Sequence, residues 1–245
     1  MKLPNLILLF VLLPQWLPAQ LWADAEGGAV ATGYNDVRIT GSGGTFFSFP
    51  VDLEDRTQLY YRLRAGYRIA PRHEVFILYA PLRLTYSGAF DRNINFKEVL
   101  FSRGTQVEGT YKFNSYRATY RYYVRSSDRL DIGLGITIKV RDALIALEGG
   151  GQRSERPDLG GVPLINFLLH WKPFDAVGLL IDGDALAGGG GRAADVMAAL
   201  TFRPDSRLSF RAGYRILEGG ADNSKVYTFA LFHYGFLGMR FEMNH

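Results

Sequence analysis

Apolar and polar residues alternate along most of this chain. In the segment 57–69, TQLYYRLRAGYRI, one face is apolar from Leu59 to Ile69, and the opposite face carries Arg62, Arg64 and Arg68. The same alternation recurs in the segments 115–124, 130–140, 165–171, 177–184 and 208–216. A period of two over such lengths is typical of β-strands. The pattern predicts an all-β protein.

The connections between these segments fall into two kinds. Four are short and rich in turn residues, at 70–74, 126–129, 172–176 and 203–207. Five are longer or richer in glycine, at 41–55, 88–109, 148–161, 188–192 and 218–224. The two kinds alternate along the chain. Nine connections predict ten strands, with both ends of the chain on the side of the short turns.

This arrangement is typical of strands that cross a bilayer. Such strands must close into a ring, because an open edge would leave backbone groups unpaired in hydrocarbon. They need about nine to eleven residues each, with apolar side chains toward lipid and polar side chains toward the lumen. We therefore predict one closed antiparallel transmembrane β-barrel of about ten strands, with short periplasmic turns and longer extracellular loops. The irregular segments 28–40 and 93–101 leave eight or twelve strands as alternatives.

A soluble sandwich or lipocalin-like barrel is the other fold considered. There the apolar face would form the core and the arginine face would meet water. Two features disfavour it: the regular alternation of short and long connections, and the Tyr and Phe residues near many strand ends. In a membrane barrel those aromatic residues form the interfacial girdles.

The first residues have the layout of a secretory signal peptide. Lys2 precedes an apolar core from Leu6 to Leu13, and Ala23-Asp24-Ala25 is a small-x-small cleavage site. The apolar core is shorter than the ~20 residues that a membrane-spanning helix needs. We predict a cleaved signal at 1–25 and a barrel domain at 26–245; cleavage after Ala19 is an alternative.

The last strand supplies a resemblance. In the segment 235–243, GFLGMRFEM, the residues Leu237, Met239, Phe241 and Met243 share one face. The chain resembles Gram-negative outer-membrane β-barrels over Gly27 to Met243, in particular small uncharacterised barrels. The likeness implies residence in the cell outer membrane, contact with outer-membrane lipids, and recognition of the last strand by the barrel-assembly machinery. Asn244 and His245 depart from the family pattern, in which an aromatic residue comes last.

Two positions interrupt the alternation. Pro81 lies within an apparent strand, where a closed barrel has no edge to host it, so we expect a bulge or break there. Tyr111 and Phe113 are out of phase with Tyr116. A bulge near residues 114–115, or a strand that continues past the membrane, would explain the shift.

Composition excludes several classes of protein. The 245 residues include no cysteine, which excludes a disulfide scaffold and a thiolate metal site. The net charge of +4 is spread along the chain without a run of like charges, so a nucleic-acid-binding tail is not expected. Four scattered histidines give no metal-ligand spacing. We predict neither a cofactor nor a metal, and composition leaves the oligomeric state open.

The polar strand faces predict a charged lumen. The bases that project inward are Arg62, Arg64, Arg68, Arg83, Arg117, Arg121, Lys139, Arg141, Arg211 and Arg215, and the acids are Asp131, Asp182, Asp184 and Asp195. From these we select one candidate cluster: Arg62, Arg64, Arg117, Arg121, Lys139, Asp182, Asp184, Arg211 and Arg215. Buried charges need partners, so a structural plug is the favoured interpretation. The excess of bases leaves open a narrow, porin-like, anion-preferring channel or a small-ligand vestibule.

An enzyme is the alternative function. Asp182 and Asp184 share the inner face of one strand, where we expect them near the outer rim, and a carboxylate pair can activate water. Omptin proteases resemble this chain in strand count and in rim acids, but no histidine is placed for their role. The His-x-Ser pair of outer-membrane deacylases is absent. The sequence favours a barrel of structural or interaction type over an enzyme.

Overall fold

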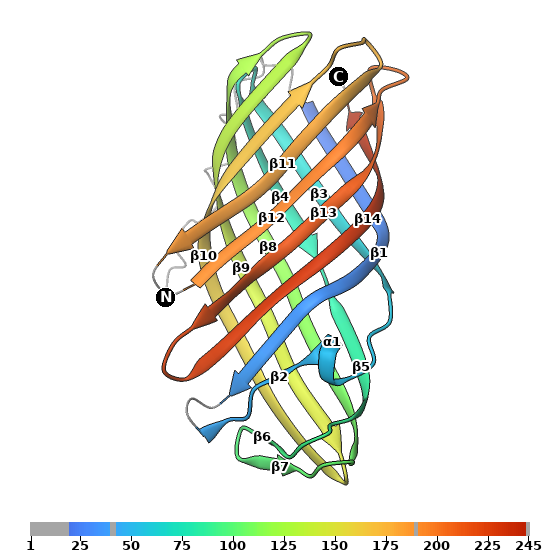
Figure 1. Ribbon diagram of the computed structural model, residues 1–245. Helices are drawn as coiled ribbons and strands as arrows, with labels where there is room; N and C mark the ends of the chain where they lie inside the picture. The colour runs from blue at the N-terminus through green and yellow to red at the C-terminus, as the bar shows by residue number, and fades with distance from the viewer. Residues whose placement is uncertain (1–19, 40–42, 189–190, 244–245) are drawn as a thin grey trace, which may run out of the picture.

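A computed structural model describes residues 20–39, 43–188 and 191–243. The chain folds into a barrel of tilted strands that carries a small cap at one end (Figure 1). The barrel strands are β1 (Gln20–Ile39), β3 (Gln58–Ala70), β4 (His73–Ala80), β5 (Arg83–Ala89), β8 (Gln106–Ser126), β9 (Leu130–Gly149), β10 (Gln152–Trp171), β11 (Val177–Gly188), β12 (Gly191–Phe202), β13 (Leu208–Asp222) and β14 (Val226–Met243). The cap elements are β2 (Phe47–Ser48), α1 (Phe49–Asp52), β6 (Ile94–Phe96) and β7 (Val99–Phe101).

The sheet closes on itself. Each barrel strand pairs antiparallel with its neighbours along the chain, and β14 pairs with β1 from Leu21↔Met243 to Ile39↔Val226. The strands β4 and β5 both pair with β8, so they are two halves of one interrupted strand. The barrel therefore has ten strands, as the alternation predicts. Among the described residues, no helix is long and apolar enough to span a membrane.

The two faces of the strands have opposite chemistry. Along β3, Leu59 is 88 % exposed on the outside while Arg62 is 6 % exposed inside. Ile136 on β9 and Leu237 on β14 are also exposed, at 63 % and 71 %. These residues belong to an apolar belt around the barrel, as expected for strands whose outer face contacts lipid. The arginines of segment 57–69 face the lumen because lipid exposure would leave them without partners.

The short turns lie where the sequence predicts them, but two of the predicted long connections, 148–161 and 218–224, are mostly strand. In the second, β13 pairs with β14 from Glu218↔Leu231 to Asp222↔Tyr227. Strands β9 and β10 pair without interruption up to Gly149↔Gln152, so most of segment 148–161 is strand and the predicted loop is wrong. Gly150 and Gly151 make the turn with φ of 59° and 76°, a region that favours glycine. The strands β8, β9 and β10 are 20 or 21 residues long and continue past the apolar belt.

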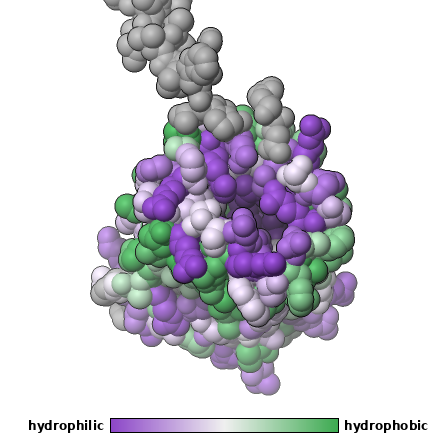
Figure 2. Space-filling model, turned by 90° about the horizontal axis from the view of Figure 1, so that it is seen from above, coloured by the Kyte–Doolittle hydropathy of each residue, from purple (hydrophilic) through white to green (hydrophobic). Residues whose placement is uncertain are grey.

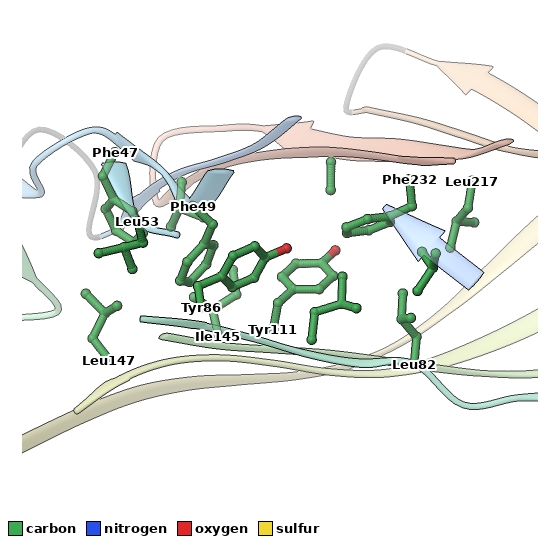
Figure 3. Close-up of a cluster of buried hydrophobic side chains, with 14 of the residues drawn as sticks. Phe47, Phe49, Leu53, Leu82, Tyr86, Tyr111, Ile145, Leu147, Leu217 and Phe232 are labelled. Carbon is green, nitrogen blue, oxygen red and sulfur yellow. The ribbon is translucent and has the colours of Figure 1, made fainter. Parts of the chain in front are cut away.

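An apolar cap fills the outer end of the barrel. We call residues 43–57 and 90–105 the outer cap. Its Phe47, Phe49 and Leu53 lie in one apolar cluster with Tyr86 and with strand residues such as Ile145 and Leu147 (Figure 3). The rings of Phe49 and Tyr86 stack with centroids 4.6 Å apart.

One ion pair ties the two halves of the outer cap together. Arg92 donates to Asp52 Oδ1 and Oδ2 over 2.7 and 2.9 Å. These bonds raise the pKa of Arg92 above its ordinary value, so its guanidinium stays charged across the physiological range.

Both local irregularities have a structural explanation. The interrupted strand breaks at Pro81, between Ala80 and Arg83, where a break was expected. The bulge considered near 114–115 is wrong, because β8 pairs with β9 there without a register shift. Tyr111 faces inward because the outer half of the barrel interior is apolar.

The amino-terminal segment contributes to the barrel earlier than predicted. Residues 1–19 of the predicted signal lie outside the described part of the chain. Residues 20–25 form the start of β1, where Ala23 pairs with Ala65 on one side and Phe241 on the other.

Candidate functional site in the barrel lumen

A network of ion pairs fills the middle of the lumen. We call it the lumen ion network; its members are Arg62, Arg64, Arg117, Arg121, Arg211 and Arg215 with Asp24, Glu26, Glu74, Asp182, Asp184 and Asp195. Most of these side chains are buried, and together they come from seven strands of the barrel wall. Strand alternation positions them, since each lies on the polar face of its own strand.

Asp195 on β12 is the centre of the network. Its carboxylate accepts from Arg62 at 2.8 Å, from Arg117 at 2.5 Å and from Arg215 at 2.6 Å. The three arginines reach it from β3, β8 and β13, and Asp195 is only 2 % exposed. One buried carboxylate thus links four strands across the barrel.

Two acids on β1 pair with arginines of the nearby strands β3 and β13. Asp24 pairs with Arg211 and, at 3.3 Å, with Arg64. Glu26 accepts from Arg215 at 2.8 Å. The sequence analysis missed both acids because it assigned Asp24 to the signal peptide and began the first strand beyond Glu26.

Asp182 and Asp184 lie inside this network rather than at an open rim. Asp182 accepts from Arg64 at 2.9 Å and from Arg121 at 2.5 Å, and Asp184 accepts from Arg117 at 2.7 Å. Each is 6 % exposed. The expected position near the outer rim is wrong, and neither carboxylate is free to act as a base.

The histidines lie apart from these acids. His170 contacts Thr201 at 3.0 Å on the short-turn side of the barrel, and His73 and His233 contact Tyr120 and Tyr214. Within the described ranges, no group of three or more His, Asp or Glu residues could hold a metal ion.

Glu74 extends the network toward the short-turn end. It pairs with Arg240 at 3.2 Å and with Arg121 at 3.7 Å, and it accepts a hydrogen bond from the Tyr123 hydroxyl at 2.9 Å. Glu74 shares the inner face of β4 with Phe76, and Ile77 is on the outer face. The period of two along this strand could have predicted this position.

Eight of the nine residues of the predicted cluster form ion pairs in the lumen. Lys139 is the exception. Lys139 is 3 % exposed, and no carboxylate of the described residues lies within ion-pair distance of its ammonium. Its Nζ lies 4.6 Å from the centroid of the Phe113 ring. Among the other bases predicted to face inward, Arg83 instead lies on the outside of β5, opposite the buried Leu84.

Two cavities flank the network. On the short-turn side, a vestibule of about 620 Å³ is lined by polar residues such as Arg68, Asp131 and Lys172. Figure 2 shows this end of the barrel, with hydrophilic side chains around a hollow and hydrophobic ones along the sides. On the cap side lies a cavity of about 260 Å³ with mostly apolar walls.

The lumen between the two cavities is nearly solid. The space enclosed by the network is about 20 Å³, and a further space near Tyr60 and Tyr234 is about 10 Å³. A single water needs roughly 10–15 Å³. Each of these two spaces has room for about one water molecule and none for a hydrated ion.

Comparisons with known proteins support the fold. The outer-membrane protease OmpT from Escherichia coli matches over 92 % of this chain and 97 % of its own, with 9 % identity and a TM-score of 0.53. The chain is an outer-membrane β-barrel in fold. Neisserial surface protein A matches 92 % of this chain and 97 % of its own, with 14 % identity and a TM-score of 0.37. The attachment invasion locus protein Ail of Yersinia pestis matches 90 % and 98 %, with 13 % identity and a TM-score of 0.38.

Sequence comparisons add no closer relative. No protein-family model matches the chain. A search of curated proteins finds no match either. The likeness to OmpT concerns the fold alone, and the protease activity in its name does not carry over to a lumen whose acids are occupied by arginines.

Proposed function

We propose that this protein is a plugged barrel of structural or interaction type in the outer membrane of a Gram-negative cell. The apolar belt supports contact with outer-membrane lipids, and the shared fold with an outer-membrane protease supports the location. The observation that carries the proposal is the lumen ion network, which leaves about 20 Å³ between the two cavities. On this proposal the barrel holds its outer cap at the cell surface and does not conduct ions.

The energetics of the network favour a plug over a channel. An ion that crossed would have to separate charge pairs such as Arg117–Asp195 and Arg215–Glu26, which lie 2.5 and 2.8 Å apart. Breaking a buried pair leaves an uncompensated charge and costs about 3–5 kcal/mol. Opening the lumen would require several such steps at once.

A planar-bilayer recording tests the proposal. The refolded protein should insert without producing step conductances, whereas an open porin added to the same membrane should produce them. Reproducible steps from this protein would contradict the plug. If such steps also showed an anion preference that Arg117→Gln reduced, the narrow channel would replace the plug as the function of the lumen.

A further inference from the structure

The wall of the outer half of the barrel contains an unpaired strand edge, whose far end contacts the outer cap where Lys97 Nζ donates to the Glu155 carbonyl over 2.9 Å. Strand β10 pairs with β9 along its whole length, but it pairs with β11 only from Ile165 onward. Residues 152–164 of β10 therefore have no strand partner on the β11 side within the described part of the chain. Figure 1 shows the long strands β8, β9 and β10 continuing toward the cap beyond the end of β11. We call this unpaired edge the side window.

The apolar cavity lies behind the side window. Its floor and walls come from β8, β9, β13 and β14, and Arg156, Asp158 and Val162 of β10 line its edge. The apolar side chains that line it include Ile39, Tyr111, Ile145, Leu217, Val226 and Phe232. At about 260 Å³ it is slightly smaller than the roughly 300–1,000 Å³ of common small-molecule pockets. It has room for one narrow apolar chain and not for two.

Lys139 projects into this cavity as a buried cation without a counter-ion. Six arginines of the lumen each contact a carboxylate, while the ammonium of Lys139 contacts the face of Phe113. A cation–π contact compensates only part of the cost of burying a charge. The walls of the cavity are mostly apolar, and Lys139 is a buried basic group in them with no carboxylate within ion-pair distance among the described residues.

Several charged side chains lie at the edge of the cavity, and two pairs of them contact each other. Arg141 contacts Asp158 at 2.6 Å, and Arg192 contacts Glu218 at 2.8 Å. These pairs are partly exposed, so they contribute little binding energy for a ligand. Arg156 and Lys225 also line the edge without an ion pair among the described residues, but Arg156 is half-buried and Lys225 is exposed, whereas Lys139 is buried. Lys139 is therefore the group that would select the charge of an occupant, and the apolar walls would select its body.

We propose that the outer cavity is a binding site for a single-chain carboxylate with an apolar body, such as a medium-chain fatty acid. The carboxylate pairs with Lys139, and the chain lies along the apolar walls toward the side window. A monoanion balances the buried charge of Lys139, and a single chain suits the volume of the cavity. The ligand enters through the side window, either from water or from the surrounding lipid. This proposal goes beyond the plugged barrel and does not depend on whether the lumen conducts.

A binding titration with matched variants tests the site. The protein is refolded in an uncharged detergent, titrated with the fluorescent acid cis-parinarate, and then challenged with dodecanoate or dodecanol. Lys139→Met keeps the length of the side chain and removes its charge. Lys172→Met makes the same change in the opposite vestibule, where Lys172 pairs with Asp131 at 2.9 Å.

The proposal predicts a distinct pattern of affinities. Lys139→Met should weaken dodecanoate binding by about tenfold or more, the loss expected for one charge-assisted hydrogen bond, and Lys172→Met should not. Dodecanol should bind to the wild type and to Lys139→Met with the same affinity, because it carries no charge that could pair with Lys139. Equal dodecanoate affinity of the wild type and Lys139→Met, or equal affinity of the wild type for the acid and the alcohol, would overturn the site.

A second variant controls for the possibility that Lys139→Met weakens binding by disturbing the fold. Ala143→Phe keeps Lys139 and places a ring in the cavity, since Ala143 lines its wall. It should exclude dodecanoate and still admit a short carboxylate such as butyrate. Unchanged dodecanoate binding in this folded variant would count against the cavity.

The source of the ligand is settled in nanodiscs. Octanoate added to the water and oleate dissolved in the bilayer report the two routes separately, each by displacement of the probe. Displacement by octanoate alone indicates uptake from water, and displacement by oleate alone indicates uptake from lipid. Failure of both would overturn the proposal.

Discussion

Arg117 and Asp195 meet in the middle of the lumen, where Nη2 of Arg117 lies 2.5 Å from Oδ2 of Asp195 although 78 residues separate them in the chain. Asp195 also accepts from Arg62 and Arg215. A single carboxylate therefore neutralises the arginines of three other strands. The lumen of this barrel is cross-linked by charge, in addition to the backbone hydrogen bonds that close its wall.

Removing the charge of Asp195 should destabilise the barrel strongly. In Asp195→Asn, three buried guanidinium groups lose a shared partner, and breaking buried pairs costs about 3–5 kcal/mol. Urea unfolding in detergent micelles, followed by tryptophan fluorescence, measures the loss. Asp175→Asn is the control, because Asp175 is exposed and pairs only with the exposed Arg129. If Asp195→Asn unfolded at the same urea concentration as the wild type, the loss of the carboxylate would cost no stability, and the prediction would be wrong.

The acids on β11 should behave as parts of the same unit. The double variant Asp182→Asn with Asp184→Asn removes partners from Arg64, Arg117 and Arg121. We expect a loss of a few kcal/mol. Because Asp184 and Asp195 share Arg117, combining the double variant with Asp195→Asn should cost less than the sum of the separate losses. Strict additivity, measured by the same urea titration, would show that the acids act independently.

The apolar belt predicts where an added charge is costly. Ile136→Arg places a guanidinium on the outside of β9 within the belt, where lipid exposure costs about 2–4 kcal/mol near the midplane. Leu100→Arg makes a similar change on β7 of the outer cap, which lies away from the belt (Figure 1), and should leave stability nearly unchanged. The comparison is made by unfolding in lipid bilayers. Equal losses at both positions would place the membrane elsewhere on the barrel.

Alternation alone could predict much of this fold. The faces of β3, β9 and β14 follow directly from the period of two, because lipid and lumen demand opposite side chains. The short turns at 70–74 and 203–207 were also predictable from their turn residues. The strand extensions were not, because Gly-rich segment 148–161 resembles a loop, and only its pairing with β9 makes it a strand.

The lumen was predictable in kind but not in detail. Each cluster residue could be assigned to an inner face, but the partners could not, because they depend on the register and tilt of strands that are distant in sequence. Arg83 is an example. Its charge predicted a position in the lumen, but the barrel interior beneath the outer cap is apolar, so Arg83 is on the exposed face of β5. Lys139 is the converse case, since only the structure reveals that it has no carboxylate partner.

The position of Asp24 predicts the mature amino terminus. Cleavage after Ala25 would remove Asp24, which pairs with Arg211 and Arg64 and is 5 % exposed. It would also remove the residues of β1 that pair with both β3 and β14, from Leu21 to Ala25. Cleavage after Ala19, the alternative site, keeps all of these contacts. We therefore expect the mature chain from outer membranes to begin at Gln20, as determined by amino-terminal sequencing and intact mass.

A pair of variants separates this prediction from the effect of cleavage itself. Asp24→Asn should lower stability in the full mature chain, because two buried arginines lose a carboxylate, by about 3–5 kcal/mol. A chain engineered to begin at Glu26 should lose at least as much, because it also lacks strand pairing. A natural mature chain that begins at Glu26 and is as stable as one beginning at Gln20 would show that the start of β1 is dispensable.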